Sequence, residues 1–256
     1  MNKNKVAARF NRAAQTYDRH AVLQKTLGNH LLERAAKQKL EPVSILDLGC
    51  GTGFFTNKLS EAFPCAKILG VDIADKMIAL AQAKYQTNNL EFMHADADNL
   101  SPAKYDLIFS NCVLQWMPNL KTTFKKIKEI LGKNGALFFA SFIDGTLQEL
   151  QNTWKEIDDR QHINKFATPI EIKNTLHQMR FVDISLECCP IKLKFNDLME
   201  LVQYLRNIGA NYAANYNSGL LGAKTLKRMS DIYQNKFSEN NKIIATFNVI
   251  YGYARN

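Results

Sequence analysis

Short apolar runs alternate with helix-patterned stretches from residue 43 onward, and this alternation predicts the fold class. The runs cover residues 43–48, 66–71, 90–94, 105–110 and 135–142. Strands that alternate with helices at such spacing indicate parallel βαβ units and a doubly wound α/β sheet. Two later runs, at 181–188 and 243–253, bring the number of predicted strands to seven.

The remaining residues are expected to surround that sheet. Segment 197–241 has a mostly helical pattern and is too long for a plain loop, so it predicts a helical cap inserted at the sheet edge. We therefore expect a single Rossmann-like, mostly parallel domain over 1–256. Its predicted divisions are an N-terminal helical arm or lid at 1–41, a ligand-binding core at 43–142, the other sheet elements with the cap at 143–242, and a terminal strand at 243–254.

Composition and charge narrow the class of protein. Hydrophobic residues make up 46% and charged residues 22% of the 256 residues, as in a globular protein. The net charge of +9 favours an acidic partner: nucleic acid, an anionic membrane surface or an acidic protein. No apolar run approaches the roughly 20 residues of a membrane span, and no signal core is present, so we expect a cytoplasmic protein without membrane contact. The five cysteines and five histidines lack metal-ligand spacing, and we predict no metal site.

A glycine-rich turn follows the first predicted strand, with the sequence Asp-Leu-Gly-Cys-Gly-Thr-Gly at 47–53. Glycines at such a turn let a ligand approach the backbone, and the following helix offers unpaired N–H groups. Asp72 ends the next strand, where it can accept hydrogen bonds from ribose hydroxyls, and Asp96 ends the third, where it can accept one from an adenine amino group. The turn lacks Gly-Lys-Ser/Thr, which counts against a phosphate loop. NAD would use Asp72 equally well, but the glycine spacing and Asp96 count against it.

Together these features resemble the class I S-adenosylmethionine-dependent methyltransferases. The resemblance implies S-adenosylmethionine as methyl donor, S-adenosylhomocysteine as product, and a methionine end held by Asp47 and Gly49. For any one residue, an ordinary turn with acidic residues at strand ends is the alternative. The predicted cofactor-binding residues are Asp47, Gly49, Gly51, Gly53, Asp72, Ile73, Asp96, Ala97 and Asn111.

Motifs along essentially the whole chain resemble the malonyl-[acyl-carrier protein] O-methyltransferases of biotin synthesis. The similar segments are Arg9-Phe10-x-Arg12-Ala13-Ala14-x-x-Tyr17-Asp18-x-x-Ala21-x-x-Gln24, Ser110-Asn111-x-x-Leu114-Gln115-Trp116, His162-x-Asn164-Lys165-Phe166, Ile208-Gly209-Ala210, Gly219-Leu220-x-Gly222 and Tyr251-Gly252. Lys165 stands where the family often has Arg, which keeps the charge but loses a bidentate fork.

That resemblance implies methyl transfer to the free carboxylate of a malonyl thioester, which gives the methyl ester that primes pimeloyl formation. A carboxylate is already ionised at pH 7, so the reaction needs no general base. The resemblance also implies that Tyr17 closes the site as a catalytic residue, with helix-to-helix packing as the alternative. The other predicted substrate or lid residues are Phe10, Gln24, Gln115, Trp116 and Lys165.

The basic surface predicts the partner. The arm at 1–41 holds nine basic and three acidic side chains, and the cap adds basic residues that include Arg206. Such charges can steer an acidic acyl-carrier protein towards the site, although singly they also serve to solvate helices. We expect a monomer.

Three other functions fit parts of the pattern. An RNA methyltransferase would explain the positive charge, but no RNA-binding module or Asn-Pro-Pro-Tyr motif is present, and we predict no nucleic-acid partner. A methyltransferase for a small acid or a quinone precursor would share the cofactor site and need no carrier surface. A non-catalytic scaffold that kept the fold would not need Asp47, Asp72 and Asp96.

Overall fold

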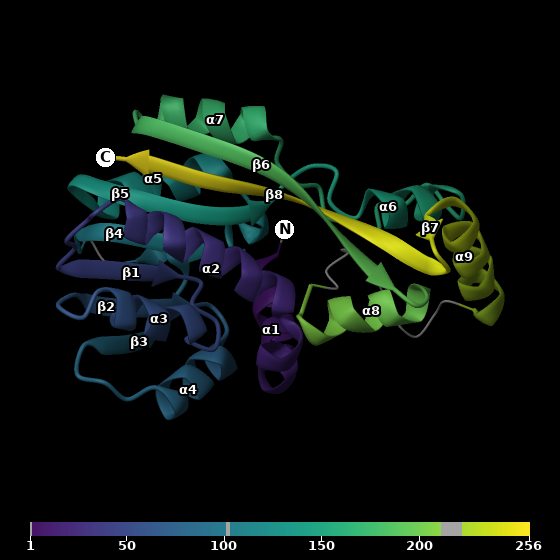
Figure 1. The fold of residues 1–256 in the computed structure, drawn as a ribbon, viewed down its shortest axis with the longest axis horizontal. Coiled ribbons are helices and arrows are strands. Elements are labelled where there is room, and N and C mark those ends of the chain that lie inside the picture. Colours follow the sequence, from purple (N-terminus) through teal and green to yellow (C-terminus); the bar gives the residue numbers. More distant parts are fainter. Residues whose placement is uncertain (1, 101–102, 211–221) are drawn as a thin grey trace.

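The strands form one continuous sheet in the computed structural model, which describes residues 2–100, 103–210 and 222–256 (Figure 1). Its order is β3-β2-β1-β4-β5-β8-β6; the first five strands are parallel, and β8 is antiparallel to both neighbours. The strands are β1 Ser44–Leu48, β2 Lys67–Asp72, β3 Leu90–His94, β4 Tyr105–Asn111, β5 Leu131–Phe142, β6 Val182–Phe195, β7 Ser238–Glu239 and β8 Lys242–Arg255. The predicted doubly wound, mostly parallel sheet of seven strands is confirmed, and the two-residue β7 pairs with β8 as an addition.

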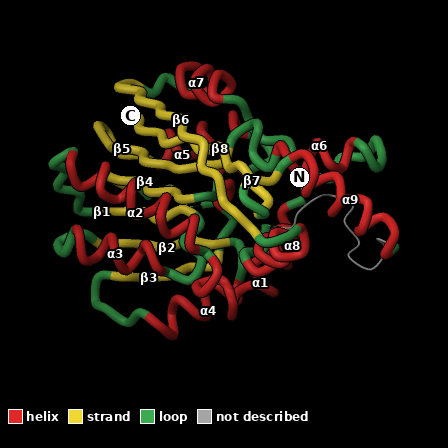
Figure 2. Tube along the Cα trace, turned by 45° about the vertical axis from the view of Figure 1, so that its right-hand side comes forward, coloured by secondary structure: helices red, strands yellow, loops and turns green. Residues whose placement is uncertain are grey.

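Helices lie on both faces of the sheet (Figure 2). Helices α2 and α3 pack on one face, where their apolar residues join one core cluster, while α5 and α7 contribute to a second cluster. The helices are α1 Lys3–His20, α2 Val22–Lys37, α3 Phe54–Ala62, α4 Asp75–Lys84, α5 Leu120–Ile130, α6 Gln148–Lys155, α7 Pro169–Gln178, α8 Leu198–Asn207 and α9 Ala223–Lys236, with short 3-10 turns η1 Ala97–Asn99 and η2 Leu114–Trp116.

Strand β1 shows why the central strands are apolar throughout. Ile45 and Leu46 are both fully buried, Ile45 in the cluster that contains α2 and α3 and Leu46 in the cluster that contains α5. Successive side chains of a strand point to opposite faces, and a parallel sheet is covered on both. The sheet therefore buries every position of β1 after its first residue. The chain leaves the sheet at Gly49, so the glycine-rich turn lies at the carboxyl edge of the sheet.

Strand β6 continues to Phe195, seven residues beyond the predicted end at 188. The predicted strand ended two residues before Pro190, which cannot donate a hydrogen bond to a sheet. Here β6 is an edge strand, where proline is tolerated. The long β6–β8 pair consequently extends past the rest of the sheet, and α6, α8 and α9 gather around its far end (Figure 1).

This far end is the predicted helical cap. Phe195 and Phe247 of the two strands share a core cluster with Leu201 of α8 and Met229 of α9. Gly219 and Leu220, part of the late glycine motif, lie outside the described residues. Among the helices of the described ranges, none is long and apolar enough to cross a membrane.

Candidate active site

The glycine-rich turn between β1 and α3 has three glycines in the left-handed region, with φ of +76° at Gly49, +55° at Gly51 and +79° at Gly53. A Cβ on Gly51 would meet no atom within 4 Å, so its backbone faces open space. A Cβ on Gly53 would lie 2.9 Å from the ring of Phe92, which makes Gly53 a packing position between α3 and β3. Gly51 is therefore the position where a ligand can approach the backbone closely.

Asp47 lies at the end of β1 with only 2% of its surface exposed. Thr56 Oγ1 donates a hydrogen bond of 2.7 Å to its carboxylate. Burial raises the pKa of Asp47 to about 7, and the nearby charge of Asp72 adds to the increase, while the bond from Thr56 opposes it. A cationic group placed beside Asp47 would stabilise the ionised form.

Asp72 ends β2, and its two oxygens accept backbone N–H groups, from Gly51 at 2.9 Å and from Ala74 at 2.8 Å. Burial raises the pKa of Asp72, although these backbone hydrogen bonds oppose the shift. The bonds fix the carboxylate at the carboxyl edge of the sheet, where ligands bind in open α/β folds. Its remaining lone pairs can accept the two hydroxyls of a ribose.

Two adjoining cavities surround these carboxylates. The first, here the edge cavity, lies over the ends of β1, β2 and β4, and the second, here the loop cavity, lies over the glycine turn. Asp47 lines the loop cavity with Cys50 and Thr52, and Gly49, Gly51 and Asn111 line both. The predicted cofactor-binding residues brought together in the edge cavity are Gly49, Gly51, Asp72, Ile73, Asp96, Ala97 and Asn111, and the predicted lid residues Phe10, Tyr17 and Trp116 line it too.

Asp96 already has a partner from the N-terminal helix. The ammonium group of Lys3 bonds to the carboxylates of both Asp96 and Asp98, and Asp98 N donates a 3.0 Å bond to Asp96 Oδ1. Lys3 thus donates to the carboxylate of Asp96, which the sequence predicted to accept a hydrogen bond from an adenine amino group. The first turn of α1 closes this end of the edge cavity.

Helix α1 is tied to the glycine turn through Asp18. Its carboxylate accepts bonds from Thr52 Oγ1 at 2.6 Å and from Lys84 Nζ at 2.8 Å. Burial alone would raise the pKa of Asp18, but these two bonds outweigh it and lower the pKa. The neighbouring Tyr17 lines both cavities and a third, and no described residue is hydrogen-bonded to its hydroxyl.

The third cavity, here the cap cavity, lies between the sheet and the cap. It has a largely apolar lining that includes Phe142, Leu150, Trp154, Leu198, Leu205, Met229 and Phe247. Phe10, Tyr17, Cys112 and Trp116 line both the cap cavity and the edge cavity, so the two adjoin along these residues. The rings of Phe10 and Trp116 stand edge to face, with centroids 5.5 Å apart. A ligand in the edge cavity and an acceptor in the cap cavity would meet beside Tyr17.

Polar side chains at this junction are held in place by hydrogen bonds. Asn111 Nδ2 donates a 2.9 Å bond to the carbonyl of Gln24, which joins β4 to α2. Gln115 donates to the carbonyl of Cys112 at 2.7 Å and accepts from Ser141 Oγ at 2.9 Å. Gln24 Oε1 is buried without a hydrogen-bond partner among the described residues, and it borders the loop and cap cavities. It is available to accept a bond from a ligand.

Comparison with known proteins decides the family. A family model for a methyltransferase domain matches residues 40–204. A malonyl-[acyl-carrier protein] O-methyltransferase of Gallionella capsiferriformans is 32% identical over 264 residues, which cover 99% of this chain and 91% of the relative. The chain belongs to the malonyl-[acyl-carrier protein] O-methyltransferase family.

Solved structures show the same fold for this methyltransferase. The YcgJ protein of Bacillus subtilis has a TM-score of 0.65 at 13% identity, covering 89% of this chain and 98% of its own. Magnesium protoporphyrin IX methyltransferase from Synechocystis, with S-adenosylhomocysteine bound, has a TM-score of 0.55 at 17% identity, covering 91% and 83%. At these identities the likeness establishes the fold.

The cofactor of the methyltransferase is S-adenosylmethionine, and the residues of the edge and loop cavities fit it. The open backbone at Gly51, the fixed carboxylate of Asp72 and the unpartnered oxygen of Gln24 match a ligand with a ribose and an amino-acid end. Asp47, Asp72 and Gln24 would hold that ligand. Within the described part of the chain, no group of three or more His, Cys, Asp or Glu residues could hold a metal ion.

Two sequence-predicted residues lie apart from the cavities of the methyltransferase. Gly53 packs against β3, as described above, and Lys165 is exposed and lines none of the three cavities. Lys165 instead acts electrostatically on Glu171, at the start of α7. The structure therefore does not support a substrate contact for Lys165; its motif neighbours His162 and Phe166 do line the cap cavity.

Sequence reasoning also missed residues that shape the site. Lys3 and Asp18 are polar residues on a helix, and their partners lie far away in sequence. No local signal identified Lys3 as a contact. Arg206 was assigned to the outer surface but lines the cap cavity. The position of Asp18 next to Tyr17 in the arm motif was the one available sign of its role.

Proposed function

We propose that this methyltransferase transfers a methyl group to the free carboxylate of the malonyl thioester of acyl-carrier protein, and that the product is the methyl ester that primes pimeloyl formation in biotin synthesis. The observation that carries the proposal is the apolar cap cavity, which adjoins the edge cavity at Phe10, Tyr17 and Trp116. Relatives with the name of this activity match nearly the full chain, which supports the choice of acceptor.

The lining of the cap cavity suits this chemistry. S-adenosylmethionine supplies the methyl group from a sulfonium centre and leaves as S-adenosylhomocysteine. The carboxylate oxygen that forms the new C–O bond is already deprotonated, so the chain has no proton to remove. Apolar side chains around the junction exclude water, which strengthens the attraction between a cationic donor and an anionic acceptor. Tyr17 and Phe10 on α1 close the junction and align the two ligands.

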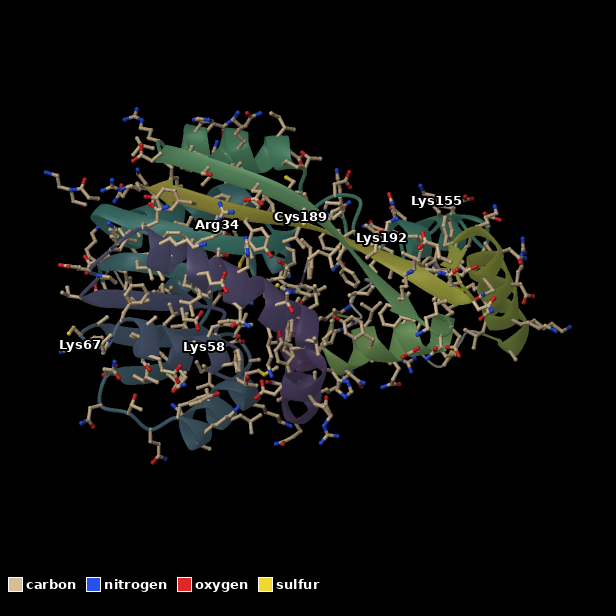
Figure 3. All side chains as sticks on the ribbon, in the orientation of Figure 1. Arg34, Lys58, Lys67, Lys155, Cys189 and Lys192 are labelled. Carbon is tan, nitrogen blue, oxygen red and sulfur yellow. The ribbon has the colours of Figure 1, made fainter. Side chains whose placement is uncertain are left out.

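The surface suits a carrier-borne acceptor. Lys155 of α6 and Lys192 of β6, both labelled in Figure 3, are exposed at the end of the molecule that carries the cap. With the basic residues of α1 they can attract an acidic carrier protein whose flexible arm enters the cap cavity. We further propose that the protein works as a single-domain monomer in the cytoplasm, without nucleic acid or membrane.

Intact-mass analysis tests the acceptor. The wild-type protein is incubated with S-adenosylmethionine and malonyl-acyl-carrier protein, and acetyl-acyl-carrier protein serves as the matched control without a free carboxylate. We expect the malonyl protein to gain the mass of one CH2 group and the acetyl protein to gain nothing.

The same experiment separates the alternatives. No gain on the malonyl protein, with calorimetry showing that the cofactor still binds, would reject this acceptor while leaving the methyltransferase assignment in place. Small carboxylic acids and RNA would then be assayed as acceptors. A gain on both carrier proteins would also reject carboxylate methylation, since the acetyl group has no carboxylate.

A further inference from the structure

Among the described residues that line the cap cavity, one carries a permanent charge: Arg206, near the end of α8. No Asp, Glu or Lys lines the cavity among the described residues, and segment 211–221 contains no charged residue in its sequence. The side chain is half-buried, and none of the described residues forms a hydrogen bond or ion pair with its guanidinium group. A partly buried cation without a counter-ion is costly, and a bound anion would remove that cost.

Arg206 lies at the end of α8 that meets α1. Thr16 Oγ1 bonds to the carbonyl of Asn207 at 3.4 Å, and a Cβ on Gly209 would lie 3.1 Å from the ring of Phe10. Phe10 lines both the cap and the edge cavities, so this end of α8 is the one beside the cofactor region. An anionic group held by Arg206 would therefore be near the place where the acceptor must react.

We propose that Arg206 binds the free carboxylate of the acceptor and thereby makes the cap cavity selective for acyl groups that end in a carboxylate. This inference rests on the proposed function. A guanidinium group matches a carboxylate in shape and carries a permanent charge. A contact to one carboxylate oxygen orients the group and leaves the second oxygen free to take the methyl group.

His162, the other basic residue of the cavity, is less suited to this role. Its Nε2 is held at 2.6 Å by Asp158, and its ring stacks on Trp154 with centroids 3.6 Å apart. His162 therefore lies on the side of the cap that α6 forms, whereas Arg206 lies on the side that meets α1. Arg206 is thus the carboxylate-binding residue that the geometry favours, in place of the exposed Lys165.

Steady-state kinetics with malonyl-acyl-carrier protein tests the proposal in four proteins: wild type, Arg206→Gln, Arg206→Lys and the matched control Arg180→Gln. Arg180 is an exposed arginine after α7 that lines none of the three cavities. We expect Arg206→Gln to lower kcat/KM about 100-fold, mainly through KM, because one partner of a charge pair is lost. Arg206→Lys should recover part of that loss, since the charge remains without the fork. Added guanidinium ion should restore part of the activity of Arg206→Gln.

Two further readouts exclude other roles of Arg206. The inhibition constant of holo-acyl-carrier protein, which lacks the malonyl group, should be the same for Arg206→Gln and wild type. Cofactor affinity by calorimetry should also be unchanged. Weaker inhibition of Arg206→Gln by the holo-carrier would show that Arg206 contacts the carrier protein. Weaker cofactor binding would show that it maintains the fold of the cofactor site, and an unchanged kcat/KM would show that it has no role in the reaction. Each of these results overturns the proposal. An inactive wild-type protein would instead reject the acceptor of the proposed function.

Discussion

Asp47 should reduce the stability of the cofactor-free protein at neutral pH, and replacement by asparagine should show by how much. Its carboxyl group is buried, and its pKa rises from 3.8 to about 7. The folded state therefore holds a proton that the unfolded state releases between these two values. Stability contributed by the protonated form is present at low pH and is lost as pH rises through this window, because ionised Asp47 is buried without a cation.

The size of the effect follows from the two pKa values. A change from 3.8 to about 7 corresponds to about 4 kcal/mol. About 3 kcal/mol of it falls between pH 5 and pH 8, since the unfolded group is already ionised at pH 5 while the folded group is still mostly protonated. Asparagine has a similar shape and no charge, and its side-chain oxygen can still accept the bond from Thr56.

Urea unfolding of the cofactor-free protein at pH 5 and pH 8 measures this difference. The free energy of unfolding of Asp47→Asn, measured relative to that of the wild type, should increase by about 3 kcal/mol between pH 5 and pH 8. Asp231→Asn, an exposed aspartate on α9, is the control and should follow the wild-type curve. Parallel pH dependences of Asp47→Asn and wild type would refute the reasoning.

The pH dependence of cofactor binding is a second test of the protonation of Asp47. If ionised Asp47 pairs with the amino group of the cofactor, binding below pH 7 must release the proton of the Asp47 carboxyl group. The affinity for the cofactor should then fall tenfold for each unit by which the pH is lowered below 7. Calorimetry in buffers of different ionisation enthalpy counts the released proton. The Asp47→Asn protein should bind more weakly and release none, so proton release by this variant would contradict the assignment.

Three other variants test the site. Tyr17→Phe should lower turnover roughly 10-fold to 100-fold with little change in cofactor affinity, since only the hydroxyl at the junction is lost; unchanged turnover would remove Tyr17 from the catalytic residues. Asp72→Ala should raise the dissociation constant of the cofactor roughly 10-fold to 100-fold through the loss of charged hydrogen bonds to ribose, and a wild-type value by calorimetry would exclude that role. Lys3→Ala should tighten cofactor binding a few-fold because Asp96 becomes free for adenine; weaker binding would show that Lys3 assists the ligand.

The parts of the fold and site that sequence could predict are those encoded locally. The carboxyl ends of β1 and β2, near Asp47 and at Asp72, followed from apolar runs next to glycines. The fourth predicted strand, 105–110, ended one residue before β4 does at Asn111. Each of these depends on a few neighbouring residues. The continuation of β6 past Pro190 was not predictable locally, because a proline is tolerated in an edge strand and strand order is a property of the whole sheet.

Side-chain contacts between distant segments were harder to predict. Lys165 was assigned to the substrate by its motif, yet the chain turns it outward while the adjacent Phe166 lines the cavity. Arg206 was assigned to the surface because a helical pattern does not say which flank of a helix meets a cavity. The bond from Lys3 to Asp96 joins residues 93 positions apart, and no local pattern carries that information.

The length of β8 has a consequence for how substrate preference can change during evolution. The C-terminal half of β8 pairs with β5 beside the cofactor half of the sheet, and Phe247, two residues before this pairing begins, lines the cap cavity. Inserting one residue in β8 would reverse which side chains face that wall and would shift its pairing along β5 and β6 together. Acceptor range is therefore expected to diversify through substitutions in α6, α8 and α9, while β8 keeps a constant length among descendants of this protein.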